Sequence, residues 1–145
     1  MRAALTGSFA AARPLLRDGI AEADDDATVQ AALHRDLAFA YLRNGDVQPS
    51  AQLAVEAVSL ARRAGDSDLV EDTETVELLR TVIGDPGRDA LTLTDRLISL
   101  SRNESSDHWL PSGSRLVLIG AMLKWIDRFD EARDVLTRAW RVAQV

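Results

Sequence analysis

The chain contains no cysteine, a single lysine and no long apolar run, and each absence excludes a class of protein or site. Without cysteine there are no disulfides, thiolate metal sites or cysteine nucleophiles, which agrees with a reducing compartment. Lys124 lies outside any Gly-Lys-Ser/Thr sequence, so a phosphate-binding loop of that kind is excluded. No apolar run approaches the roughly 18 residues of a membrane span, and the amino-terminal residues lack the apolar core of a signal peptide. We therefore expect a cytoplasmic protein without membrane contact.

The charge balance is acidic. The 145 residues include 17 basic and 23 acidic side chains, which gives a net charge of −6. Binding to a nucleic-acid backbone needs clustered cations, so we expect no direct nucleic-acid contact by this segment. Hydrophobic residues at 46% and charged residues at 28% are typical of a folded globular chain with a moderate core.

Apolar residues recur with the period of a helix along the chain, and the alternation typical of strands is missing. The clearest stripe lies near the carboxyl end, where Ala132, Val135, Leu136, Ala139 and Trp140 share one helix face. The pattern predicts an all-α fold of about seven helices, at 8–21, 27–43, 47–64, 67–83, 87–102, 112–126 and 129–143.

A small turn followed by an alanine-rich helix returns at nearly constant spacing. Gly7, Gly45, Asp85 and Asp127 mark these turns, in steps of 38, 40 and 42 residues (45 − 7, 85 − 45 and 127 − 85). Such steps fall within the periods of two-helix solenoid repeats. We predict a single repeat domain over 1–145, composed of a half repeat at 1–21 and repeats at 27–64, 67–102 and 112–143.

Local signals support these helix boundaries. The acidic run 24–26 precedes the second predicted helix, where carboxylates can cap exposed N–H groups; the alternative, a cation site, lacks the alternating ligands of an EF-hand. Asp68 and Glu71 have the spacing of a capping box for the fourth predicted helix. The irregular stretch 103–111 is predicted to be a loop between repeats.

Two stretches resemble the tetratricopeptide repeat. The first contains His34, Leu37, Ala38 and Tyr41 and is followed by Gly45. The second and better match has four matching first-helix residues and four in the helix after them: Leu116, Ile119, Gly120, Leu123, Phe129, Ala132, Leu136 and Ala139. The resemblance implies a right-handed α-α superhelix of helix pairs. The central repeat departs from the pattern, because Glu74, Glu77 and Leu78 stand where the family has apolar, apolar and small residues.

The segment 123–136 and the long period also resemble the helical-repeat region of large ATP-binding transcriptional regulators of the LuxR family. In that family a nucleotide-binding module precedes the repeats and a helix-turn-helix DNA reader follows them. The resemblance implies that this chain is the regulatory middle of such a protein. Because the first repeat lacks its first helix and no polar capping helix follows the last, we expect a piece of a longer chain. Exposed end helices, including Phe9, Leu15, Leu16 and Ile20, could form a homodimer.

The tetratricopeptide resemblance implies that the first helix of each pair lines a concave recognition face. The matching positions are Arg35, Phe39, Arg43, Lys124 and Trp125. Cations flanking an aromatic ring can hold an acidic peptide or a small anionic effector, so we predict a protein or effector partner. In the alternative interpretation, Phe39 is buried and the arginines pair with neighbouring carboxylates.

No catalytic residue, metal ligand or cofactor site is predicted. His34 and His108 are the only histidines and lack zinc-binding spacing, so His34 is interpreted as a packing or surface residue. Trp109 and Trp140 are interpreted as core residues. The acidic helix patch of Glu71, Asp72, Glu74 and Glu77 is interpreted as a solvated face. The alternative function is a small-molecule-binding or enzymatic all-α domain that uses this patch for acid–base chemistry.

Overall fold

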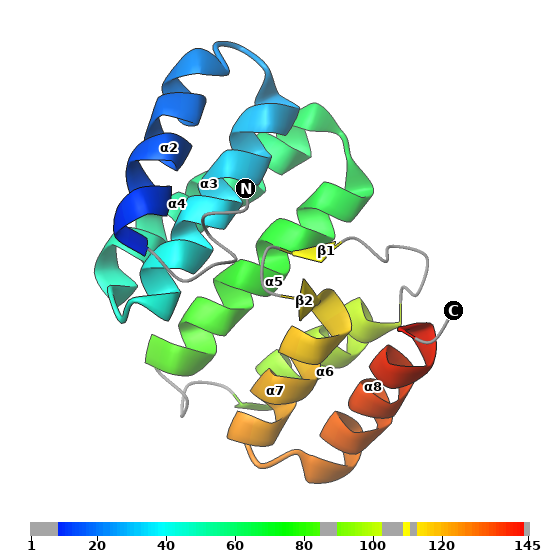
Figure 1. The fold of residues 1–145 in the computed structure, drawn as a ribbon. Coiled ribbons are helices and arrows are strands. Elements are labelled where there is room, and N and C mark those ends of the chain that lie inside the picture. Colours follow the sequence, from blue (N-terminus) through cyan, green and yellow to red (C-terminus); the bar gives the residue numbers. More distant parts are fainter. Residues whose placement is uncertain (1–8, 85–89, 103–108, 111–112, 144–145) are drawn as a thin grey trace. The chain divides into compact units, whose positions relative to one another are not determined.

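The computed structural model describes residues 9–84, 90–102, 109–110 and 113–143, which are almost wholly helical (Figure 1). The predicted all-α fold of about seven helices is confirmed for this described part of the chain. The seven helices are α2 (Phe9–Glu22), α3 (Ala27–Arg43), α4 (Val47–Ala64), α5 (Ser67–Gly84), α6 (Ala90–Ser101), α7 (Arg115–Trp125) and α8 (Phe129–Val142).

A short β-hairpin precedes α7. The strand β1 (Trp109–Leu110) pairs antiparallel with β2 (Gly113–Ser114), and Trp109 lies opposite Ser114. The predicted helix start at 112 is therefore wrong, since α7 begins only after β2. Strands of two residues are too short to produce the alternation by which a sequence reveals a strand. The rest of the predicted loop, residues 103–108 and 111, lies outside the described residues.

Aspartates cap two of the helices. The Asp26 carboxylate accepts hydrogen bonds from the Thr28 and Val29 backbone N–H groups, at 3.0 and 3.1 Å, so the predicted capping role of the acidic run is confirmed. At α5 the cap is Asp66, whose carboxylate accepts from the Leu69 N–H at 3.0 Å. The predicted capping box that begins at Asp68 is wrong, because Asp68 already lies in the first turn of the helix.

The chain forms two compact units, residues 1–80 and 81–145. Helix α5 crosses the boundary, which falls inside the predicted repeat 67–102. The predicted single domain and its right-handed superhelical arrangement stay predictions.

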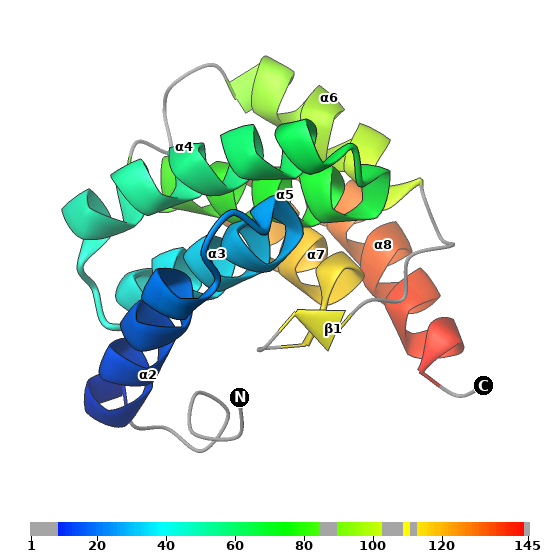
Figure 2. The same ribbon diagram turned by 90° about the horizontal axis from the view of Figure 1, so that it is seen from above.

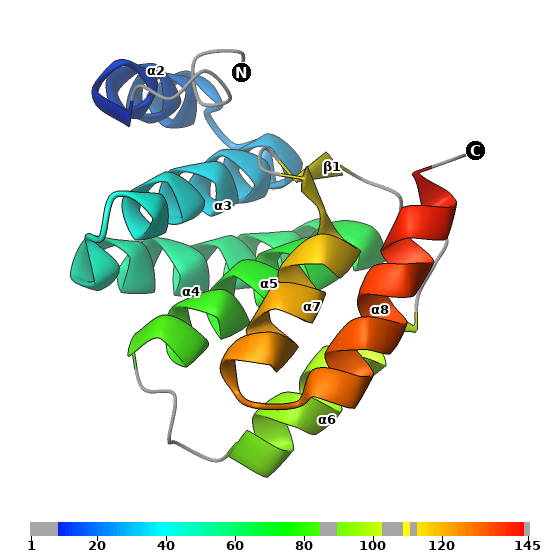
Figure 3. The same cartoon turned by 60° about the horizontal axis from the view of Figure 1, so that its bottom comes forward.

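In the first unit, α3 lies between α2 and α4 (Figures 2 and 3). Small side chains allow α3 and α4 to approach closely: Ala38, Ala54 and Ala57 are each 0% exposed. The Ser50 hydroxyl of α4 donates a hydrogen bond to the Ala38 carbonyl of α3 at 2.8 Å. Larger residues at these positions would separate the helices and break the hydrogen bond between Ser50 and Ala38.

Tyr41 of α3 anchors α2. Its ring meets Phe9 edge-on, with ring centroids 5.1 Å apart, and its hydroxyl accepts a hydrogen bond from the Arg17 guanidinium at 2.8 Å. Phe9 thus packs on α3, whereas Leu15 on the same helix is 61% exposed.

In the second unit, α7 and α8 lie side by side as an antiparallel pair (Figure 1). Gly120 of α7 allows Leu136 of α8 to reach the α7 backbone, because a Cβ atom at position 120 would lie 2.5 Å from Leu136 Cγ. Helix α6 is tied to α8 by Arg138, which donates hydrogen bonds to the Ser101 carbonyl and hydroxyl at 2.8 and 2.9 Å.

The turn between α3 and α4 and the turn between α7 and α8 share equivalent backbone hydrogen bonds. Gly45 has a φ of 85° and Asp127 a φ of 61°, and these residues are 82 positions apart (127 − 45). In the first turn the Asp46 N–H donates to the Tyr41 carbonyl at 2.9 Å. The Arg128 N–H donates to the Leu123 carbonyl at the same distance. An offset of 82 therefore relates equivalent positions of the two pairs, and it matches Gly120 with Ala38 and Leu136 with Ala54.

We predict that Gly120→Ala destabilises the protein by about 1–3 kcal/mol, because the added methyl group forces Leu136 away from α7. In a Leu136→Ala background the same change should cost far less stability, since positions 120 and 136 are then both alanine, as the equivalent positions Ala38 and Ala54 are in the first pair. Urea unfolding of the wild type, both single variants and the double variant measures this coupling. An equal cost in both backgrounds would contradict the proposed contact.

Candidate functional site

The predicted recognition residues of α3 do not form an open surface together. Phe39 is 7% exposed and Arg35 is 8% exposed, whereas Arg43, the last residue of α3, is exposed. Arg35 and Phe39 thus lie as the alternative interpretation describes. Arg43 alone of the three keeps the exposure that ligand recognition requires.

Arg35 is held by two carboxylates. Its guanidinium lies 2.8 Å from Asp36 and 3.4 Å from Asp72, and all three side chains are more than nine-tenths buried. Burial raises the pKa of Asp36, and the charge and hydrogen bond of Arg35 oppose this effect only in part. The cluster links α3 to α5 within the first unit.

The acidic helix patch is largely engaged in ion pairs. Asp72 is buried against Arg35, so its interpretation as part of a solvated face is wrong. Glu74 lies 3.0 Å from Arg62, and Glu77 lies 3.0 Å from Arg80. The partners of Asp72 and Glu74 are 37 and 12 positions away in the sequence, a separation at which a local charge pattern carries no information.

Lys124 and Trp125 belong to the second unit, at the end of α7. Both are exposed, Trp125 at 56%. Lys124 lines a groove of about 460 Å³ along α8, together with six residues of that helix: Phe129, Ala132, Arg133, Leu136, Thr137 and Trp140.

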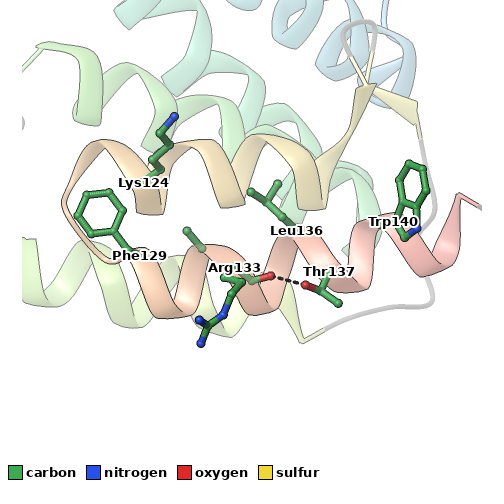
Figure 4. A pocket seen from close by; sticks show the side chains of 7 residues that line it. Lys124, Phe129, Arg133, Leu136, Thr137 and Trp140 are labelled. Carbon is green, nitrogen blue, oxygen red and sulfur yellow. Dashed lines mark hydrogen bonds between the residues drawn. The ribbon is translucent and has the colours of Figure 1, made fainter.

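Figure 4 shows how the groove is built. Phe129 lies at one end and Trp140 at the other, and Leu136 between them points toward α7. Lys124 extends from α7 and Arg133 from α8, on opposite sides of this apolar row. An apolar row bordered by a cation on each side therefore runs along the helix pair.

The apolar row of the groove is exposed. Phe129 is 60%, Leu136 38% and Trp140 67% exposed. The interpretation of Trp140 as a core residue is wrong, because the apolar stripe of α8 is wider than the face that its neighbours bury. Ala132 and Val135, on the covered part of that stripe, are 4% and 3% exposed. The side chain of Trp109 lies outside what the structure describes.

Charge in the groove is positive. None of the seven described lining residues carries a carboxylate. Arg133 forms one ion pair, at 3.3 Å from Asp130, but both side chains are more than 70% exposed, and such pairs contribute little. The groove can therefore accept a ligand that is apolar along its centre and anionic at its margins.

Sequence reasoning found Lys124 but missed the rest of this groove. Phe129, Leu136 and Trp140 were all visible as apolar residues of one helix, at spacings of seven and four. The signal that separates them from the core is their distance from the centre of the stripe, which Ala132, Val135 and Ala139 occupy.

The described residues contain little that points to metal or redox chemistry. His34 is 9% exposed, with Nδ1 2.8 Å from the Gln30 carbonyl and Nε2 3.3 Å from Glu56, which confirms its packing role. Residues 9–84, 90–102, 109–110 and 113–143 include no group of three His, Asp or Glu side chains placed to share a metal ion. His108 lies outside the described residues.

Comparisons with protein-family models, with curated proteins and with solved structures found no match to this chain. Among the described helices, none has both the length and the apolar character needed to cross a membrane.

We predict that lowering the pH raises the stability of the wild type relative to that of the Asp36→Asn variant. Since the pKa of Asp36 is raised on folding, the native state takes up a proton at a higher pH than the unfolded chain does. The contribution of Asp36 to stability therefore grows as pH falls through the folded pKa and levels off below the unfolded value. Thermal unfolding between pH 7 and about pH 4 measures the difference. The exposed Asp18→Asn is the control, and parallel pH curves for wild type and Asp36→Asn would refute the burial effect.

Proposed function

We propose that this chain is a non-catalytic helical-repeat module that recognises a protein or an effector, and that the groove between α7 and α8 is its recognition surface. The observation that carries the proposal is the exposed row of Phe129, Leu136 and Trp140. Exposed apolar rows bordered by polar side chains mark interaction sites, and large aromatic residues dominate binding energy at such sites. Lys124 and Arg133 supply the polar border.

We further propose that the module is the regulatory region of a cytoplasmic transcriptional regulator of the LuxR family. Its support is the resemblance of segment 123–136 and the tetratricopeptide-like pattern of helix pairs. The absence of cysteine agrees with a reducing compartment. A groove that binds a partner or effector would give such a region its means of control.

The acidic patch gives less support to a catalytic function. Acid–base chemistry needs carboxylates whose pKa values differ beside a space for substrate. Asp72 is occupied by Arg35, and Glu74 and Glu77 pair with arginines. Burial raises the pKa of Asp36, but this carboxylate lies against the same Arg35.

A peptide library displayed on phage tests the recognition surface. Peptides selected on the wild-type chain should bind Trp140→Asp about tenfold more weakly or worse, because the variant places an unpaired charge in the apolar row. Leu15→Asp is the matched control, since Leu15 is an exposed apolar residue of α2, outside the groove. Peptides that bind both variants as well as the wild type would contradict the proposed surface.

A further inference from the structure

A cavity lies at equivalent positions in the two units. In the first unit it has a volume of about 340 Å³ and lies among α2, α3 and α4. In the second unit a cavity of about 470 Å³ lies between α6 and α8. The offset of 82 relates the two linings, because it matches Ile20, Leu53 and Glu56 with Arg102, Val135 and Arg138 (102 − 20, 135 − 53 and 138 − 56).

The polar residues of the first cavity are engaged with one another. The Arg17 guanidinium donates a hydrogen bond to the Tyr41 hydroxyl at 2.8 Å, and His34 Nε2 lies 3.3 Å from the Glu56 carboxylate. All four side chains belong to the lining. We assign no ligand to this cavity, because its donors and acceptors already satisfy each other.

The second cavity is lined by three arginines. Arg102 directly follows α6, and Arg138 and Arg141 belong to α8. The equivalent residues of the first unit are Ile20, Glu56 and Ser59 (141 − 82 = 59). Since the first unit folds with an apolar, an acidic and a neutral residue at these positions, packing of the helices does not require the three cations.

One of the three arginines is held in place by the protein. Arg138 donates to the carbonyl and the hydroxyl of Ser101, and that hydroxyl donates to the Ile98 carbonyl at 2.7 Å. Arg102 and Arg141 are exposed, and neither has an ion-pair partner within the described part of the chain. The cavity therefore combines a positioned guanidinium with two that can turn toward a ligand.

Two carboxylates also line this cavity, and only one of them is uncompensated. Glu131 accepts a hydrogen bond from Arg128 Nε at 3.0 Å, so its charge is balanced by that residue. Asp134 is exposed and has no ion pair among the residues that the structure describes. Three cations and one anion leave an excess of two positive charges (3 − 1). A phosphate monoester carries a charge of about −1.5 to −2 near neutral pH.

We propose that the cavity between α6 and α8 binds a small phosphate ester, whose phosphate is held by Arg102, Arg138 and Arg141. Guanidinium groups donate pairs of hydrogen bonds to phosphate oxygens, and the volume is that of a small-molecule site. Ile98 and Val135 contact the carbon skeleton, and the carboxylate of Asp134 accepts a hydrogen bond from a ligand hydroxyl group.

This site goes beyond the proposed recognition groove. The three arginines are absent from the residues that line the groove between α7 and α8. The two sites can therefore be tested separately, with Trp140 as the marker of the groove.

Titration of the isotope-labelled whole chain with glucose 6-phosphate, followed by nuclear magnetic resonance, tests the site. The Nε–H signals of Arg102, Arg138 and Arg141 should shift together and saturate. Glucose 6-phosphate should bind at least about fivefold more tightly than inorganic phosphate at the same ionic strength, because it adds the hydroxyl and apolar contacts. Glucose alone should give no saturable shift.

Arg102→Gln and Arg141→Gln should each weaken the binding of glucose 6-phosphate about tenfold, since each removes a charged donor. Arg133→Gln is the matched control, because Arg133 is an exposed arginine of α8 that does not line this cavity. Asp134→Ala should tighten the binding of inorganic phosphate and reduce the preference for glucose 6-phosphate. These variants change exposed side chains, and thermal unfolding shows whether each one folds.

Four results would overturn the inference. Equal affinity of the wild type, Arg102→Gln and Arg141→Gln for glucose 6-phosphate refutes the site. Inorganic phosphate that binds as tightly as glucose 6-phosphate refutes the ester. Arginine-dependent binding of a phosphoserine peptide, without binding of glucose 6-phosphate, assigns the arginines to a phosphorylated protein. Loss of glucose 6-phosphate binding in Trp140→Asp places the ligand in the groove, whereas failure of the arginine variants alone leaves the proposed function intact.

Discussion

Where α3 crosses α4, and where α7 crosses α8, the helix backbones approach closely because the side chains between them are small. Ala38 and Ala54 are fully buried in the first pair, and Gly120 admits Leu136 in the second. This contact fixes the pair as a unit and leaves two of its sides available for further helices. The burial or exposure of each pair's remaining faces depends on which of those two sides a further helix covers.

The two helix pairs carry different residues at equivalent positions. Arg35 in the first pair is paired with Asp72 of a covering helix, and Val117 at the equivalent position has no described helix over it. A surface that carries Phe129, Leu136 and Trp140 costs solvation free energy when it is exposed. This exposed surface lies beside cations, without a carboxylate among its described lining residues, and the proposed recognition rests on it.

The sequence was a good guide to local structure and a poor guide to tertiary cover. Helix boundaries could be predicted because period, caps and turns are local, and α3 and α4 begin and end where the pattern places them. The burial of Asp72 could not be predicted, because its partner lies 37 positions away. Trp140 was misplaced for a related reason: an apolar stripe shows which face avoids water, but it does not show whether another helix arrives to cover that face.

Carbene footprinting of the free chain tests the central claim most directly, because a photoactivated diazirine labels apolar side chains in proportion to their exposure. If the second pair is open where the first is covered, fragments with Val117, Phe129, Leu136 and Trp140 will be labelled strongly. Fragments of α3 with Ala31, Arg35 and Leu42 will be labelled weakly. Weak labelling of the α7–α8 fragments, equal to that of α3, would contradict the open groove on which the proposed recognition depends.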